Sequence, residues 1–280
     1  MSLVLTEQQG HVTVVTLNKA EKMNSYNVAL HTELLEAIQN ADADPKSRVI
    51  VVTGAGRAFC AGADISDGFS GAGFTQAPPQ IDGINRDYGG ILTLAIHECD
   101  TPIIAAINGV AVGIGATMTL PMDIKVISRK AKMGFPFARR GIVFDAASSW
   151  FLPRMIGWNK AQELILTGRV FGAEEADKIG LVNYIVEPEE VLPKALEIAH
   201  DIAQNCSPKS VAQNKQLLRA SQINGFDYGK GPIAGPLAAH IMESDMLNKA
   251  FVSEDCHEGV QSFLEKRAPK FANYMSKKTD

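Results

Sequence analysis

The chain has 280 residues, enough to bury one large hydrophobic core or a core with a smaller attached region. Its residues are 46% hydrophobic and 21% charged, as in an ordinary globular protein, and the formal net charge of −4 argues against nucleic-acid binding, which needs a basic surface. The N-terminus lacks a signal-peptide pattern, no apolar run reaches the length of a membrane span, and the four cysteines are scattered. These features predict a cytoplasmic protein without a membrane partner.

The first half of the chain alternates strand and helix patterns. Residues 11–17 alternate as in a strand, and residues 28–40 carry apolar side chains at helical spacing. Residues 49–53 form a continuous apolar strand pattern. Residues 66–83 are rich in Gly, Pro and Ser, so we expect a long loop that forms a lid or a pocket wall.

The same alternation continues toward residue 190. Helices are predicted at 91–98 and from residue 115 to 120, and strands at 103–107, 124–127 and 181–186. Strands separated by helices at this spacing indicate an α/β layered structure.

After about residue 191 the strand patterns stop. Three helices are predicted there, over residues 192–206, 208–221 and 239–267. The sequence therefore predicts an α/β region over residues 1–190 and a helical region over residues 191–280.

Two glycine-rich segments, residues 49–65 and 102–120, are the most informative part of the chain. Each reads as a buried strand, then a tight turn, then the start of a helix. Such a turn leaves backbone N–H groups without carbonyl acceptors, pointing into a cleft. Two of these turns facing each other would hold a developing negative charge on oxygen.

Other motifs of known chemistry do not fit. Gly54 and Gly56 lack the third glycine of a dinucleotide fingerprint, since Phe59 stands in its place. Residues 68–71 fail the spacing of a nucleophile elbow, and no Walker loop occurs. No HExxH pair exists and the histidines are dispersed, so no metal site is expected.

Four segments together resemble the crotonase superfamily, that is, the enoyl-CoA hydratase/isomerase family, in that family's order. They are LNKAEKMNSYN (17–27), AFCAGADI (58–65), INGVAVGIGATMTLPMDI (107–124) and SEDCHEGVQSFLEKRAPKF (253–271). The resemblance implies an α/β spiral of ββα repeats with a helical C-terminal region that builds homotrimers or dimers of trimers. It also implies an acyl-CoA thioester substrate and no separate cofactor, because coenzyme A is part of the substrate.

The resemblance also assigns site residues. It implies that the backbone N–H groups of Ala63 and Ile114 hold the thioester oxygen; the family more often has glycine at position 114. Isoleucine keeps the N–H group but narrows the pocket. Further residues match positions that bind the substrate or its coenzyme A: Lys22, Ala61, Asp64, Ile65, Phe137 and Lys266.

The acids distinguish the reactions within the family. Thr117 and Phe137 stand where the hydratases carry two glutamates, which puts two-glutamate hydration in doubt. Asp145, eight residues beyond Phe137, resembles the single catalytic carboxylate of the peroxisomal type of Δ3,Δ2-enoyl-CoA isomerase. One base suffices to move a double bond between C3 and C2, a step of fatty-acid β-oxidation. We expect apolar neighbours to raise the pKa of Asp145 toward neutrality.

Three alternatives stay open at this point. Asp145 is followed by Ala-Ala-Ser-Ser and an apolar run, which is also the signature of a helix N-cap. The second alternative is a hydratase, or another lyase or hydrolase of this fold, in which Asp145 directs a water molecule. A protein that binds acyl-CoA without turnover is the third reading.

Overall fold

A large sheet runs through the computed structural model, which describes residues 2–64, 80–81, 84–221, 226–227, 232–233 and 253–273. Its strand order is β1-β2-β3-β7-β9-β12. The β1–β2 pair is antiparallel, and every later pair is parallel. The strands are β1 (Val4–Gln9), β2 (Val12–Leu17), β3 (Val49–Gly54), β7 (Ile103–Ile107), β9 (Ile124–Ser128) and β12 (Tyr184–Val186).

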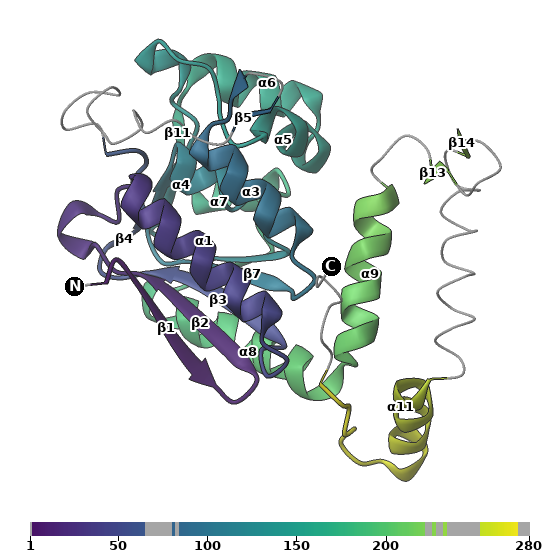
Figure 1. Cartoon of the computed structure of the whole chain (residues 1–280). Coiled ribbons are helices and arrows are strands. Elements are labelled where there is room, and N and C mark those ends of the chain that lie inside the picture. The colour runs from purple at the N-terminus through teal and green to yellow at the C-terminus, as the bar shows by residue number, and fades with distance from the viewer. Residues whose placement is uncertain are drawn as a thin grey trace.

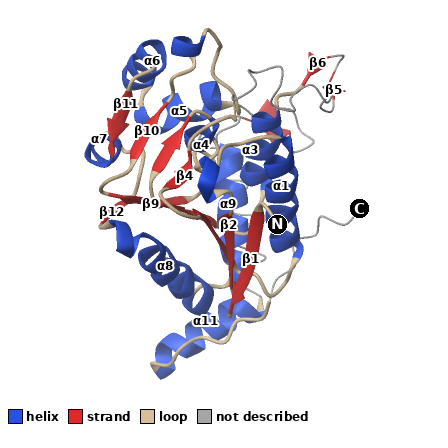
Figure 2. Cartoon of the chain, turned by 90° about the vertical axis from the view of Figure 1, so that its left-hand side faces the viewer, coloured by secondary structure: helices blue, strands red, loops and turns tan. Residues whose placement is uncertain are grey.

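A smaller sheet of order β11-β10-β8-β4 stands beside the first (Figure 2). Its strands are β4 (Ala58–Cys60), β8 (Val110–Val112), β10 (Lys132–Gly134) and β11 (Val170–Gly172). The chain passes from β3 to β4, from β7 to β8 and from β9 to β10, each time entering a helical segment before it returns. The α/β structure predicted from the sequence patterns is confirmed, and the fold is the spiral of ββα repeats that the family resemblance implies.

Helices pack on both faces of the large sheet. On one face α1 and α3 lie side by side (Figure 1), and α8 covers the other face. The helices are α1 (Val28–Ala43), α3 (Tyr88–Glu98), α4 (Ile114–Thr117), α5 (Ser148–Ile156), α6 (Trp158–Thr167), α7 (Ala173–Lys178), α8 (Val191–Asn205), α9 (Pro208–Ser221) and α11 (Glu254–Glu265), with short 3-10 turns η1 (Ala20–Lys22), η2 (Ala138–Arg140) and η3 (Pro188–Glu190).

The alternation of side chains along the strands explains why α8 belongs to this core. Val12, Val14, Val49 and Val51 point to one face of the sheet and are buried there. The residues of α8 that meet this face recur every four positions and are small, which lets the helix lie close to the strands. They are Ala195, Ala199 and Ala203.

Some predicted elements differ from the structure. The helix expected from residue 115 to 120 is only Ile114–Thr117, because the next hydrogen bonds are i→i−3 and Pro121 has no N–H to continue them. Strand β1 was not predicted. The expectation that strands stop after residue 191 is wrong, since β13 (Phe226–Asp227) pairs with β14 (Pro232–Ile233).

Two predicted segments lie largely outside the described residues. Of the loop at 66–83, the structure describes only β5 (Gln80–Ile81), which pairs with β6 (Ile84–Asn85). Of the helix expected at 239–267, it describes α11 and the residues that follow it.

Candidate active site

A cavity of about 200 Å³ lies where the two glycine-rich turns meet. It is bounded by the turn after β4, the turn from β8 into α4, and the segment that leads from β10 to α5. Its lining residues are Ala61, Gly62, Ala63, Val112, Gly113, Ile114, Pro136, Phe137, Arg140, Ile142 and Asp145. The structure thus brings together five of the residues singled out in the sequence: Ala61, Ala63, Ile114, Phe137 and Asp145.

The two turns are in direct backbone contact. Gly113 has φ +58°, a conformation that side chains disfavour, and a Cβ there would lie 3.8 Å from the Cα of Gly62. A Cβ on Gly115 would lie only 2.0 Å from the carbonyl oxygen of Cys60, so α4 rests on the backbone at the end of β4. Glycine is therefore favoured at position 113 by its positive φ and required at position 115 by the close approach of the Cys60 backbone.

Each turn presents one backbone N–H group at the cavity. The peptide around Ala63 is fixed by two hydrogen bonds, from the Tyr26 N–H to the Gly62 carbonyl and from the Asp64 N–H to the Tyr26 carbonyl, both 2.8 Å. The N–H of Gly113 donates to the Gly134 carbonyl at 3.0 Å. Within the described residues neither the Ala63 nor the Ile114 N–H has an acceptor, so both are available to an oxygen atom in the cavity.

Asp145 brings a carboxylate to the same cavity. The Thr117 hydroxyl donates to its Oδ1 at 2.9 Å. The pKa of Asp145 is raised to about 6, chiefly by burial and also by the negative charge of Asp87, while the Thr117 hydrogen bond acts in the opposite direction. The expectation of a pKa shifted toward neutrality is confirmed. Such a carboxyl group can both accept and return a proton near neutral pH.

The helix-cap interpretation of Asp145 is wrong for its side chain. Helix α5 begins at Ser148, and its N-cap is Ala147. Only the main-chain carbonyl of Asp145 takes part, accepting from the Ser148 N–H at 2.9 Å and from the Ser148 hydroxyl. The two extra residues before the helix turn the side chain toward Thr117 and the cavity.

Several predicted substrate-binding residues lie elsewhere. Asp64 accepts from Lys19 at 2.9 Å and pairs with Lys22 at 3.5 Å, and neither Asp64 nor Lys22 lines the cavity. These ion pairs tie the first loop to the turn after β4. Lys266 directly follows α11, which is well separated from α4 in both views (Figures 1 and 2). Ile65 is outside the described residues.

Two residues near the cavity were not assigned a place in it from the sequence. Arg140 lines the cavity, whereas its neighbour Arg139 donates to the Thr167 carbonyl at 2.7 Å. Thr117 was noted only as a replaced glutamate; its hydroxyl contact with Asp145 spans 28 residues and no local pattern reveals it. Cys60 is fully buried and its pKa is raised to about 12, as expected for a core thiol.

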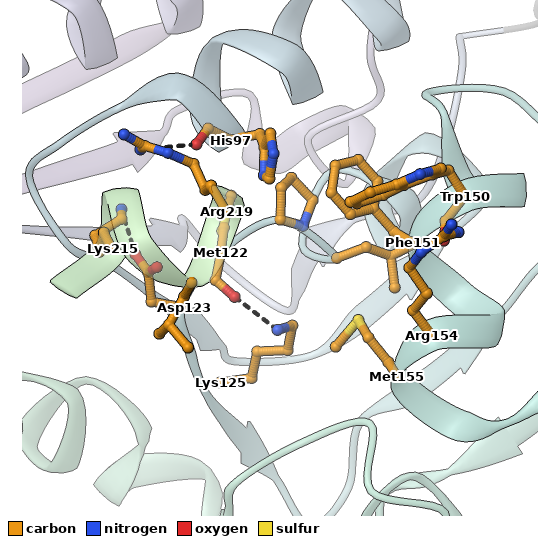
Figure 3. A pocket seen from close by; sticks show the side chains of 13 residues that line it. His97, Met122, Asp123, Lys125, Trp150, Phe151, Arg154, Met155, Lys215 and Arg219 are labelled. Atoms are coloured by element: carbon orange, nitrogen blue, oxygen red, sulfur yellow. Dashed lines mark hydrogen bonds and ion pairs between the residues drawn. The ribbon is translucent and has the colours of Figure 1, made fainter. Parts of the chain in front are cut away.

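A second cavity, of about 250 Å³, holds none of the predicted residues (Figure 3). It lies between α9, α5 and the start of β9. Lys215 of α9 pairs with Asp123 at 2.8 Å, Arg219 pairs with Asp100 at 2.5 Å, and the buried Lys125 donates to the Met122 carbonyl at 2.7 Å. The two ion pairs fix α9 to the core and Lys125 is held by its own turn, so the catalytic site is sought in the first cavity.

Two backbone N–H donors and a carboxylate line one cavity of this ββα spiral, an arrangement suited to binding an oxyanion. Comparison with known sequences agrees: the profile described as enoyl-CoA hydratase/isomerase matches residues 7–274. The chain belongs to this family of acyl-CoA enzymes.

Relatives within the family carry different activities in their names. Enoyl-CoA hydratase ACTT3 of Alternaria alternata is 42% identical over 94% of this chain and 84% of its own length. The 1,2-epoxyphenylacetyl-CoA isomerase of Escherichia coli is 31% identical over 97% of this chain and 98% of its own. The crystal structure of enoyl-CoA hydratase from Bacillus anthracis superposes with a TM-score of 0.83 at 29% identity, covering 97% of this chain and 100% of that one.

Two further surveys concern the described residues alone. No helix among them is both long enough and apolar enough to cross a membrane. Within the same residues, no three His, Cys, Asp or Glu side chains gather as a metal site would require.

Replacing Asp145 by Asn should stabilise the protein at neutral pH. The folded-state pKa of about 6 lies above the ordinary 3.8, so the ionised carboxylate destabilises the fold at pH 7. Asn keeps an acceptor for Thr117 and removes this cost, which is up to about 3 kcal/mol from the pKa difference. The gain should appear in urea unfolding at pH 7 and vanish below pH 4. Equal stabilities of the two proteins at pH 7 would contradict the raised pKa.

Proposed function

We propose that this protein is an enoyl-CoA isomerase that moves a double bond between C3 and C2 of an enoyl-CoA. The observation that carries the proposal is the placement of Asp145: it is the one acid among the described residues that line the cavity. Thr117 and Phe137 stand at the positions of the two hydratase glutamates and offer no second carboxylate.

The thioester oxygen would accept hydrogen bonds from the N–H groups of Ala63 and Ile114. Removing a proton from C2 of a 3-enoyl thioester places negative charge on that oxygen, and two preorganised donors stabilise it by roughly 3 kcal/mol each. Asp145 takes the C2 proton as general base. The resulting acid returns the proton to C4, which leaves the 2-enoyl thioester. The reaction is redox-neutral, so coenzyme A within the substrate is the only cofactor that it requires.

Charged residues in the cavity lining and around it suggest how coenzyme A is held. Arg140 lines the cavity and carries a permanent positive charge that suits a phosphate or carboxylate of the ligand. Lys22, Asp64 and Lys266 keep their proposed place near coenzyme A only through the family resemblance. A neighbouring subunit would bring Lys266 to the site, since α11 stands apart from α4, which borders the cavity (Figures 1 and 2).

Hydration of a 2-enoyl-CoA is the second candidate, favoured by the name of the 42% identical relative. Asp145 would then direct a water molecule without help from a second carboxylate. An assay that follows the absorbance of the conjugated thioester distinguishes the candidate functions. A rise with 3-enoyl-CoA supports isomerisation, a fall with trans-2-enoyl-CoA supports hydration, and binding without either change supports an acyl-CoA-binding protein.

Asp145→Asn should abolish turnover of 3-enoyl-CoA and leave acyl-CoA binding largely intact. The amide cannot accept the C2 proton, and a positioned base contributes roughly 10²–10⁴-fold to the rate. Steady-state kinetics and calorimetric titration with a saturated acyl-CoA measure the two effects. Near-normal turnover by the variant would rule out Asp145 as the base.

The acid side of the pH–rate profile should report the Asp145 carboxyl. The rate needs the carboxylate, so kcat/KM should fall as the pH drops through about 6. Thr117→Val removes the hydrogen bond that opposes this shift and should move the acid limb to higher pH. A limb that stays in place, or moves to lower pH, would contradict the assigned contact.

We also propose that residues 191–280 include an association region and that the protein is a homotrimer or a dimer of trimers. Helix α11 exposes Val260 and Leu264, apolar side chains that a second subunit would cover. Sedimentation equilibrium should give three or six times the 30.1 kDa of one chain. The double variant Val260→Asp/Leu264→Asp should have a lower mass. A native protein that sediments as a monomer would refute the proposal.

A further inference from the structure

The segment that carries Asp145 has a strained backbone. Ala146 has φ +59° and Ala147 has φ +52°, so two consecutive alanines lie in the left-handed region. Each such residue costs about 1–2 kcal/mol relative to a right-handed conformation. Strain of this kind persists only where surrounding contacts impose it. The contacts on Ala146 therefore decide where the Asp145 side chain points.

The first turn of α3 supplies these contacts. Oδ1 of Asp87, the N-cap residue, accepts from the Gly90 N–H at 2.5 Å and from the Ala146 N–H at 3.2 Å. The Thr93 hydroxyl donates to the Ala146 carbonyl at 3.0 Å. Both main-chain polar groups of Ala146, which is fully buried, are thus paired with α3.

The same helical turn also touches the backbone-donor side of the cavity. A Cβ on Gly89 would lie 2.7 Å from Cδ1 of Ile114 and 3.3 Å from Cβ of Ala146. The start of α3 therefore packs between the residue that supplies an oxyanion donor and the residue that follows the base. A shift of this turn would change the distance between the two.

We propose that Asp87 is a positioning residue for the Asp145 base, acting through the N–H of Ala146. Its carboxylate joins the cap of α3 to the left-handed turn and so holds the Asp145 side chain against Thr117 and the cavity. This inference rests on the proposed function, in which Asp145 accepts the substrate proton. Thr93 supports the same peptide from its carbonyl side.

Asp87 can act on Asp145 in two ways, through its hydrogen bond to the Ala146 N–H and through its negative charge, and the two effects can be measured separately. Tyr26 and Cys60 also interact electrostatically with Asp145, but burial raises the pKa of both, so they are neutral near pH 7. Arg140 contributes a guanidinium group to the cavity lining. Asp87 is therefore the neighbouring acid whose removal should change the titration of Asp145.

Two substitutions at position 87 test the proposal. Asp87→Asn keeps an oxygen that accepts from both N–H groups, so kcat at pH 8 should stay within about twofold while the acid limb of kcat/KM moves to lower pH. Asp87→Ala removes both hydrogen bonds, so kcat should fall by up to about 100-fold with little change in KM, since small misplacements cost that much. Thr93→Val should lower kcat without moving the limb.

Asp42 offers a matched control. Its Oδ1 also accepts from two backbone N–H groups, those of Asp100 at 3.1 Å and Thr101 at 2.9 Å, away from the cavity. Asp42→Ala should lower thermal stability about as much as Asp87→Ala does, since each variant loses two hydrogen bonds. It should leave kcat and the acid limb of the kcat/KM profile unchanged. The proposal would be overturned by any of three results. Asp42→Ala could lower kcat as much as Asp87→Ala does, Asp87→Ala could keep a normal kcat, or Asp87→Asn could lower kcat as much as Asp87→Ala does.

A readout that does not depend on turnover separates this inference from the proposed function. Hydrogen exchange of the Ala146 amide, followed by mass spectrometry, should accelerate in Asp87→Ala and stay slow in Asp87→Asn. If the native protein converts neither enoyl-CoA, the proposed function fails, and the exchange rates still decide whether Asp87 holds this turn. Unchanged exchange in Asp87→Ala would refute the contact itself.

Discussion

The close approach of two backbones is the constraint on which the site depends. Strands β4 and β8 are parallel neighbours, with Ala58 opposite Val110, so the turns that follow them meet at one edge of the small sheet. Glycines at 62, 113 and 115 leave no side chain to separate these turns. The two N–H groups converge because of sheet pairing, and no flexible side chain has to be ordered to place them.

The acid beside this pair of backbone donors, Asp145, lies in the same partly buried cavity. A carboxylate in the same partly buried space is poorly solvated, which raises its pKa toward the range where it exchanges protons at neutral pH. The Thr117 hydroxyl limits that shift and orients the oxygen that it contacts. The destabilising environment of Asp145 is thus also what suits it to accept and return a proton.

The sequence predicts what local patterns encode. Apolar runs predicted strands β3, β7 and β9, and the glycine-rich segments predicted two turns that face each other. The assignment of Ala63 and Ile114 within these turns came from the family resemblance. The cap interpretation of Asp145 failed because two left-handed residues separate it from α5, and nothing in Ala-Ala-Ser-Ser announces them. The pairing of Asp64 with Lys22 competes with a ligand role, which residue types alone do not reveal.

Contacts between distant residues were beyond the reach of local patterns. The bonds from Thr117 to Asp145 and from Ala146 to Asp87 join residues 28 and 59 positions apart. They arise only after the repeats of the spiral have stacked on one another. Side chains that orient the catalytic groups are therefore harder to find from one sequence than the groups themselves.

The three repeats each bring one part of the chemistry: the first carries Ala63, the second Ile114 and the third Asp145. A partly folded chain that lacks any one repeat has no complete site, so catalytic competence marks the end of assembly and not an early stage of it. The division also favours evolutionary change. A mutation in the third repeat can replace the acid while the backbone donors of the first two repeats stay in place.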